Sequence, residues 1–140
     1  GKRVLRKEPN ELITEVRFRE KPLNSSTSLL KFDRRKAHIM GYVVVATYAH
    51  MDHEVIKDVA IAFDSVGKPY PGRAKLVEEF LKGKSLTDNV LSRAVKEVLI
   101  KEMTRVSDYR ATSDYRLYLS GVLLKRSLLK VKERIRSSLG

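Results

Sequence analysis

The run YVVVATYAHMDHEVIKDVAIAF, residues 42–63, decides the fold. Its first part, residues 42–50, is β-branched and aromatic and reads as a strand that is apolar on both faces. In its second part, residues 54–63, large apolar side chains alternate with smaller or polar ones, which also predicts a strand. The short link of residues 51–53 predicts an antiparallel hairpin. A strand that is apolar on both faces needs cover on both sides, by helices of this chain or by another domain or subunit.

Two extended segments precede the hairpin, and a loop follows it. Residues 11–18, ELITEVRF, alternate between two sets of side chains and predict a strand, and residues 27–35 are a second extended candidate. Glycine and proline punctuate residues 65–72, which predicts the loop that ends the sheet.

Everything after that loop has helical spacing. Residues 73–83 predict a helix that Gly83 ends, and residues 85–103 predict a second helix capped by Ser85 or Thr87. A third helix is expected from near Ser113 to about Ile135. Strands followed by helices indicate the α+β class. We therefore expect one domain over residues 1–140, with an antiparallel sheet of three to four strands (about 11–63) and a three-helix C-terminal half (about 73–135).

Composition excludes several classes of protein. The chain has no cysteine, so it forms no disulfide, thiolate metal site or iron–sulfur ligation of its own. It has no apolar run of about 18 residues, and its first ten residues lack the apolar core of a signal peptide. We expect a cytoplasmic protein that does not enter a membrane.

The net charge is strongly positive, with 29 Lys and Arg against 17 Asp and Glu, or +12. Such an excess can indicate nucleic acid, an anionic membrane surface or an acidic protein partner, or simply a solvated surface. The basic residues are spread along the chain among acids, and only KFDRRK (31–36) is dense. No RNA-binding aromatic signature is present, which disfavours nucleic acid.

No motif for catalysis is evident. The sequence contains no nucleophile elbow, Walker loop, dinucleotide fingerprint or zinc-protease motif. The stretch HMDHE (50–54) has the composition of a metal site, but at a hairpin tip its side chains are expected to be solvated. We predict no metal ligand and no catalytic residue, and thus no self-contained active site.

The stretch SDYRATSDYR (107–116) contains the same four residues twice. A period of six fits neither a helix nor a strand, so the two copies cannot present one face. We expect the first copy to lie in a connection and the second to open the last helix, with Thr112 or Ser113 as its N-cap and Asp114 near the positive helix end. Tyr115 is then expected to pack inward.

Three segments together, in their order and spacing, carry a family resemblance. They are the aliphatic-Lys-x₂-Arg-Arg element at 30–35, the Arg-Ala-x₃-Glu element at 73–83 and the duplicated segment at 107–116. The chain resembles the C-terminal domain of the FAD-binding (medium) subunit of molybdenum hydroxylases, the group of carbon monoxide dehydrogenase, xanthine dehydrogenase and archaeal aldehyde dehydrogenases. The resemblance implies the fold of the carbon monoxide dehydrogenase flavoprotein C-terminal domain.

The resemblance also implies cofactors and partners. In such enzymes a large molybdopterin subunit oxidises the substrate, a small iron–sulfur subunit passes the electrons on, and FAD in the medium subunit delivers them to an acceptor. The family's N-terminal FAD-binding region is not in this sequence, so we expect a fragment or a split subunit that binds no FAD alone. The alternative is a free-standing basic binding module for nucleic acid or an acidic protein, with no redox role.

The resemblance assigns expected roles to individual residues. Ile13 and Lys31 match the positions that approach FAD, and the alternative is a core role for Ile13 and a surface charge for Lys31. We expect Arg34 and Arg35 to be structural or interfacial. The same expectation covers three residues of the duplicated segment, Arg110, Tyr115 and Arg116. The triplet His38-Ile39-Met40 departs from the family's pattern.

Overall fold

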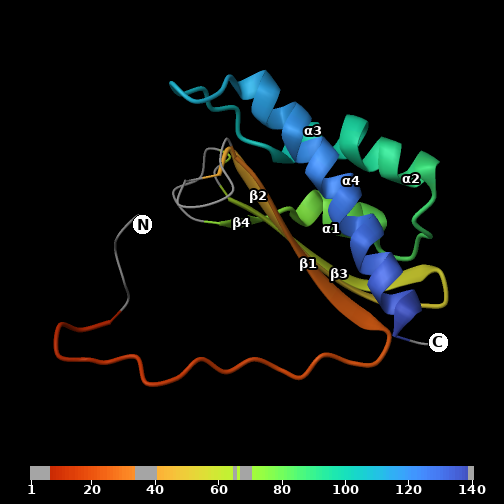
Figure 1. Ribbon diagram of the computed structural model, residues 1–140, viewed down its shortest axis with the longest axis horizontal. Helices are drawn as coiled ribbons and strands as arrows, with labels where there is room; N and C mark the ends of the chain where they lie inside the picture. The colour runs from red at the N-terminus through yellow and green to blue at the C-terminus, as the bar shows by residue number, and fades with distance from the viewer. Residues whose placement is uncertain (1–6, 34–40, 65, 67–70, 139–140) are drawn as a thin grey trace.

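A four-stranded antiparallel sheet forms one layer of the molecule and helices form the other (Figure 1). The computed structural model describes residues 7–33, 41–64, 66 and 71–138. The sheet order is β1-β2-β3-β4, so that neighbours in sequence are neighbours in the sheet. The strands are β1 (Ser25–Phe32), β2 (Val43–Asp52), β3 (Val55–Asp64) and β4 (Gly72–Arg73).

The predicted hairpin is present as β2 and β3. Asp52 pairs with Val55, so the turn consists of His53 and Glu54, and His53 takes a left-handed φ of 50°. An irregularity in the register lies between His50 and Met51. The expected solvation of this tip holds for His53, which is exposed, but Glu54 binds two cations of the last helix, Lys132 at 2.5 Å and Arg136 at 2.6 Å. Hydrogen bonds from these two cations lower the pKa of Glu54.

The helical half begins with α1 (Lys75–Leu81), followed by Gly83 at a φ of 75°. The second predicted helix is one continuous rod made of α2 (Asp88–Arg93), the π-helical η1 (Ala94–Leu99) and α3 (Ile100–Glu102). Thr87 is its N-cap, since the Thr87 hydroxyl accepts from the Val90 amide at 3.3 Å. The last helix is α4 (Ser113–Ser137). None of the described helices is long and apolar enough to cross a membrane.

The core lies between the helices and one face of the sheet. Helix α4 packs across β1 and β2, and α1 packs on β3 (Figure 1). Alternate strand residues enter this core, and a buried hydrogen bond of 2.9 Å joins the Thr47 hydroxyl of β2 to the Ser127 hydroxyl of α4. The largest fully buried side chains come from both layers: Met51, Ile56, Ile61, Leu81, Leu91, Leu99, Leu124 and Leu128. The predicted α+β class with an antiparallel sheet is therefore confirmed.

The predicted strand at residues 11–18 is wrong for this chain. These residues form no strand, and their trace runs apart from the sheet (Figure 1). Leu12, Val16 and Phe18 are at least 80% exposed. A strand requires a neighbour for its backbone N–H and C=O groups, and no described segment supplies one to residues 11–18. The second extended segment is a strand, and it ends at Phe32 rather than at 35.

Helix α4 approaches η1 closely at Gly121. A Cβ atom on Gly121 would lie 2.5 Å from Cγ1 of Val95, so the two helices meet here only because this position lacks a side chain. Beside the contact lies an apolar groove of about 670 Å³ between α2, η1 and α4, with Lys96, Lys125 and Arg126 among its lining residues.

We predict that Gly121→Ala destabilises the protein by about 1 kcal/mol, because overpacking against the stiff Val95 outweighs the better helix propensity of alanine. In a Val95→Ala background the same change should instead stabilise by up to about 1 kcal/mol. Urea unfolding of the four proteins in this double-mutant cycle measures both effects. An unchanged effect of Gly121→Ala in the two backgrounds would contradict the contact.

Candidate functional site

Most of the residues singled out from the sequence lie at one end of the sheet, where β1 ends and β2 begins. Tyr42 donates its backbone N–H to the Phe32 carbonyl at 2.8 Å, which holds the end of β1 and the start of β2 together. The aromatic rings of Phe32 and Tyr42 also contact each other, with centroids 6.2 Å apart. Lys31 forms an ion pair with Asp33 at 2.8 Å. Residues 34–40, which include Arg34 and Arg35, lie outside the described residues.

The stem of Lys31 passes close to Gly41. A Cβ atom on Gly41 would lie 3.2 Å from Cγ of Lys31 and 3.1 Å from Cγ2 of Val44. A side chain at position 41 would thus crowd the lysine stem. The Lys31 side chain as a whole is 40% exposed.

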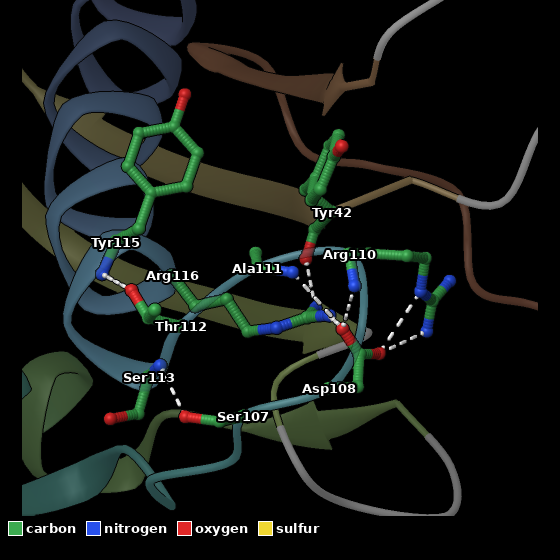
Figure 2. A network of polar contacts seen from close by, with 9 residues as sticks. All are labelled: Tyr42, Ser107, Asp108, Arg110, Ala111, Thr112, Ser113, Tyr115 and Arg116. Carbon is green, nitrogen blue, oxygen red and sulfur yellow. Dashed lines mark hydrogen bonds and ion pairs between the residues drawn. The ribbon is translucent and has the colours of Figure 1, made fainter.

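The Arg116 guanidinium lies beneath this end of the sheet (Figure 2). Arg116 is 3% exposed and comes from the first turn of α4. It donates to the Tyr42 carbonyl at 2.6 Å and to the Asp108 carboxylate at 2.7 Å. One buried cation therefore connects the last helix, the start of β2 and the connection that precedes α4.

Asp108 accepts hydrogen bonds from several donors (Figure 2). The backbone N–H groups of Arg110 and Ala111 donate at 2.9 and 3.1 Å, and the Arg110 side chain donates through two nitrogens at 3.0 and 2.7 Å. Partial burial raises the pKa of Asp108, but the hydrogen bonds from Arg110 and Arg116 and from the two backbone amides lower it well below its usual range. The hydrogen bond to Asp108 raises the pKa of Arg110.

The second copy of the duplicated tetrapeptide acts differently, as predicted. The Thr112 hydroxyl caps α4 by accepting from the Tyr115 amide at 3.3 Å. Asp114 is exposed and pairs with Arg105 at 3.1 Å. Tyr115 stays 43% exposed and meets Tyr42 edge-on with centroids 6.5 Å apart, so the prediction that it packs inward is met only in part.

The two residues expected near FAD do not lie in the same place. Ile13 is 67% exposed on the segment that runs apart from the sheet, whereas Lys31 lies at the end of β1. The core alternative for Ile13 is therefore wrong within the described residues. Sequence reasoning missed Asp108 and the Tyr42 carbonyl. The sequence signal for Asp108 was its place in the duplicated segment that also contains Arg110 and Arg116. Nothing in the sequence links Arg116 to Tyr42, which lies 74 positions away.

The sheet face away from the helices is uncovered by the described residues. A groove of about 500 Å³ crosses it. The register places Leu29, Ala46, Ala62 and Arg73 in one row across the four strands, and Thr27, Tyr48 and Ala60 in the next row. Lys31 belongs to the same face one row further on, because side chains alternate along β1. Three alanines, Ala46, Ala60 and Ala62, lie on the floor of the groove between larger side chains, and Lys31 follows in the next row of the sheet.

In the described part of the chain, no group of three or more histidines and carboxylates is placed to hold a metal ion. The basic side chains beside the groove have partners. Arg73 binds Glu78 at 2.5 Å, and this hydrogen bond raises the pKa of Arg73. Arg134 donates to the Thr27 carbonyl at 2.5 Å. The groove thus has a mixed lining of alanine, leucine, hydroxyl-bearing and arginine side chains.

Comparison with known proteins identifies the family. A family model described as the CO dehydrogenase flavoprotein C-terminal domain matches residues 28–131. The chain belongs to this family. Two indole-3-acetaldehyde oxidases of Zea mays are similar to it, at 39% identity over 66 residues and 35% over 72 residues. These matches cover 47% and 51% of this chain but only 5% of either oxidase.

Solved structures share the fold. A carbon monoxide dehydrogenase from Hydrogenophaga pseudoflava that lacks the Mo-pyranopterin moiety aligns with a TM-score of 0.73 at 22% identity, over 81% of this chain and 38% of that chain. A quinoline 2-oxidoreductase from Pseudomonas putida 86 aligns with a TM-score of 0.69 at 22% identity, over 78% and 37%. A reconstituted CO dehydrogenase from Oligotropha carboxidovorans gives 0.73 at 24% identity, over 81% and 39%. The chain thus spans under two fifths of the solved chains that it matches.

We predict that Asp108→Asn lowers the melting temperature by several degrees at pH 7, whereas Asp114→Asn, the same position in the second copy, has a much smaller effect. The folded-state pKa of Asp108 is depressed. Its contribution to the stability of the folded state is therefore present above its unfolded pKa of about 3.9 and is lost as pH falls below that value. The difference in melting temperature between the wild type and Asp108→Asn should therefore shrink below about pH 4. Thermal unfolding followed by circular dichroism at several pH values measures it, and equal effects of the two substitutions would refute the assignment.

Proposed function

We propose that this chain acts as the C-terminal domain, or as a subunit equivalent to it, of the flavoprotein component of a molybdopterin, iron–sulfur and FAD dehydrogenase. In that complex it covers FAD together with the FAD-binding region, and it helps to assemble the enzyme that passes electrons from the molybdenum centre to an acceptor. The observation that carries the proposal is the uncovered sheet face with Lys31 at its end, in a chain of the flavoprotein C-terminal domain family.

The uncovered face has the properties of a contact surface. The helices cover one face of β2, and the first half of the other face carries Val44, Ala46 and Tyr48. Leu29 is 68% exposed there, beside the alanines of β2 and β3. Small side chains let another backbone or a planar ring approach the sheet closely, and an exposed apolar surface of this kind gains free energy when it is covered.

The residues present fit one side of an FAD site and not a whole one. The groove is open and its lining is partly apolar and partly polar, and the described residues include no glycine-rich loop that could hold a pyrophosphate. FAD would supply the electron-carrying chemistry when bound. Lys31 would hold a positive charge near the flavin or its pyrophosphate, which opposes negative charge and, near the N1/O2 edge, favours the reduced anion. The face beside it would exclude water from that side.

The partners follow from the same proposal. They are the FAD-binding region, a small iron–sulfur subunit and a large molybdopterin subunit. The net charge of +12 suits acidic partner surfaces, and this attraction should weaken as salt screens it.

We expect the purified chain to contain no flavin, and to bind the FAD-loaded FAD-binding region of the same flavoprotein. On binding, iodide should quench the flavin fluorescence less than it does in the FAD-binding region alone, because one side of the ring becomes covered. Lys31→Met should lower the midpoint potential of the bound flavin, since a positive charge that favours the reduced anion is lost. Lys57→Met, at the opposite end of the sheet, is the matched control and should leave the potential unchanged.

Binding should also weaken as the salt concentration rises, which calorimetry over a salt series measures. Stoichiometric FAD in the isolated chain, or no binding to the FAD-binding region at low salt, would contradict the proposal. Salt-dependent binding to nucleic acid in its place would favour the basic binding module.

A further inference from the structure

Helix α4 has two apolar stripes. The first packs on the sheet and contains the buried residues Leu119, Leu123, Leu124, Leu128 and Val131. The second lies along the groove of about 670 Å³ between α4 and the rod of α2, η1 and α3, and it contains Leu117, Tyr118, Val122 and Leu129. Of these, Tyr118 is 66% exposed and Leu129 is 40% exposed. A helix that is apolar on two sides normally packs on two sides, so the second stripe lacks a neighbour among the described residues.

The groove has the length and shape that would seat a further helix. Its α4 wall extends from Asp114 to Leu129, which is about 22 Å or four helical turns. Leu91 and Ile100 lie on the opposite wall, and the two walls approach most closely where Gly121 meets Val95. Amphipathic helices dock in apolar grooves of this kind through side chains at spacings of three and four residues.

The wall opposite α4 has an unusual backbone. The π-helical η1 (Ala94–Leu99) contributes Val95 and Lys96 to the groove. π-Helical turns are rare, and those that occur are frequently found at functional sites. This feature points to the groove independently of its apolar lining.

The charges along the groove select the kind of helix. Three cations line it, Lys96, Lys125 and Arg126, and the one acid among the lining residues is Asp114, which is already paired with Arg105. Lys125 binds Asp88 at 2.9 Å, but Lys96 and Arg126 have no ion-pair partner within the described residues. An occupant with acidic side chains beside its apolar face would pair with these two cations.

We propose that this groove is a docking site for an amphipathic, acidic α-helix of a partner polypeptide. The apolar face of that helix covers the second stripe of α4, and its acidic residues lie beside Lys96 and Arg126. A second copy of this chain is disfavoured as the occupant, since two proteins of charge +12 repel each other. The inference goes beyond the proposed function, because it concerns the helical layer and requires neither FAD nor the open face of the sheet.

A synthetic peptide of two Leu-Glu-Glu-Leu-Leu-Glu-Glu heptads is the probe. We expect saturable binding by fluorescence anisotropy, and about tenfold weaker binding of two control peptides. One control has lysine at every glutamate, and the other has the same composition in an order without an apolar face. Because a protein of charge +12 attracts any acidic peptide, the site must also be located. In nuclear magnetic resonance spectra the largest shifts should occur at groove residues such as Val95, Gly121 and Val122.

Two matched pairs of variants test the charges and the apolar stripe. Arg126→Glu should weaken peptide binding about fivefold, whereas Lys130→Glu, on the same helix but outside the groove, changes the net charge equally and should have less than about a twofold effect. Leu129→Gln should also weaken binding about fivefold. Its control is Leu76→Gln on α1, where the leucine is similarly exposed, at 45%, and lies outside the groove. Circular dichroism checks that all four variants are folded.

Three results would overturn the inference. They are no saturable binding below about 1 mM peptide, equal effects of the groove variants and their controls, and shifts that lie away from the groove. Binding of dodecanoate in the groove without binding of the peptide would show a site for a small amphiphile instead. A dimer by light scattering that Leu129→Gln dissociates would show a second copy as the occupant. Since no measurement includes FAD or the FAD-binding region, none of these results bears on the proposed function.

Discussion

The buried guanidinium of Arg116 is the interaction on which the rest of the structure depends. A buried cation is stable only when charged and polar partners surround it, and here they are the Asp108 carboxylate and the Tyr42 carbonyl. These partners come from the connection before α4 and from the start of β2. Because α4 is fixed at its first turn in this way, and at its last turns by the contacts of Arg136 and Lys132 with Glu54, it lies across one face of β1 and β2.

That placement leaves the opposite face of the sheet uncovered by the described residues. Apolar side chains on the open face of a sheet gain free energy when another surface covers them. One row of this face contains Leu29, Ala46 and Ala62. Lys31 lies in the next row, near the end of β1. Under the proposed function, this face would form one side of a site shared with another part of the enzyme. The same logic applies to residues 11–18, whose pattern lacks a neighbour within the described chain.

The parts of the fold that were predicted correctly depend on local patterns. Alternation and a short link predicted the hairpin of β2 and β3, and helical spacing with Thr87 and Thr112 as caps predicted the second and last helices. The strand prediction for residues 11–18 was wrong because strand pairing is not local. The different roles of the two Ser-Asp-Tyr-Arg copies were predicted from their spacing of six, but which aspartate would bind two arginines was not.

By itself, the sequence determined the order and type of most elements, the family, and the absence of a self-contained catalytic motif, since these follow from periodicity, punctuation and residue types along the chain. Only the tertiary structure decided that Arg116 binds the Tyr42 carbonyl and that Val95 packs against Gly121. It also decided that one sheet face and the segment 11–18 have no neighbour among the described residues. The reason is physical. Burial, pairing and pKa depend on neighbours brought together from distant parts of the chain, and a linear pattern specifies the face of an element but not what lies against it.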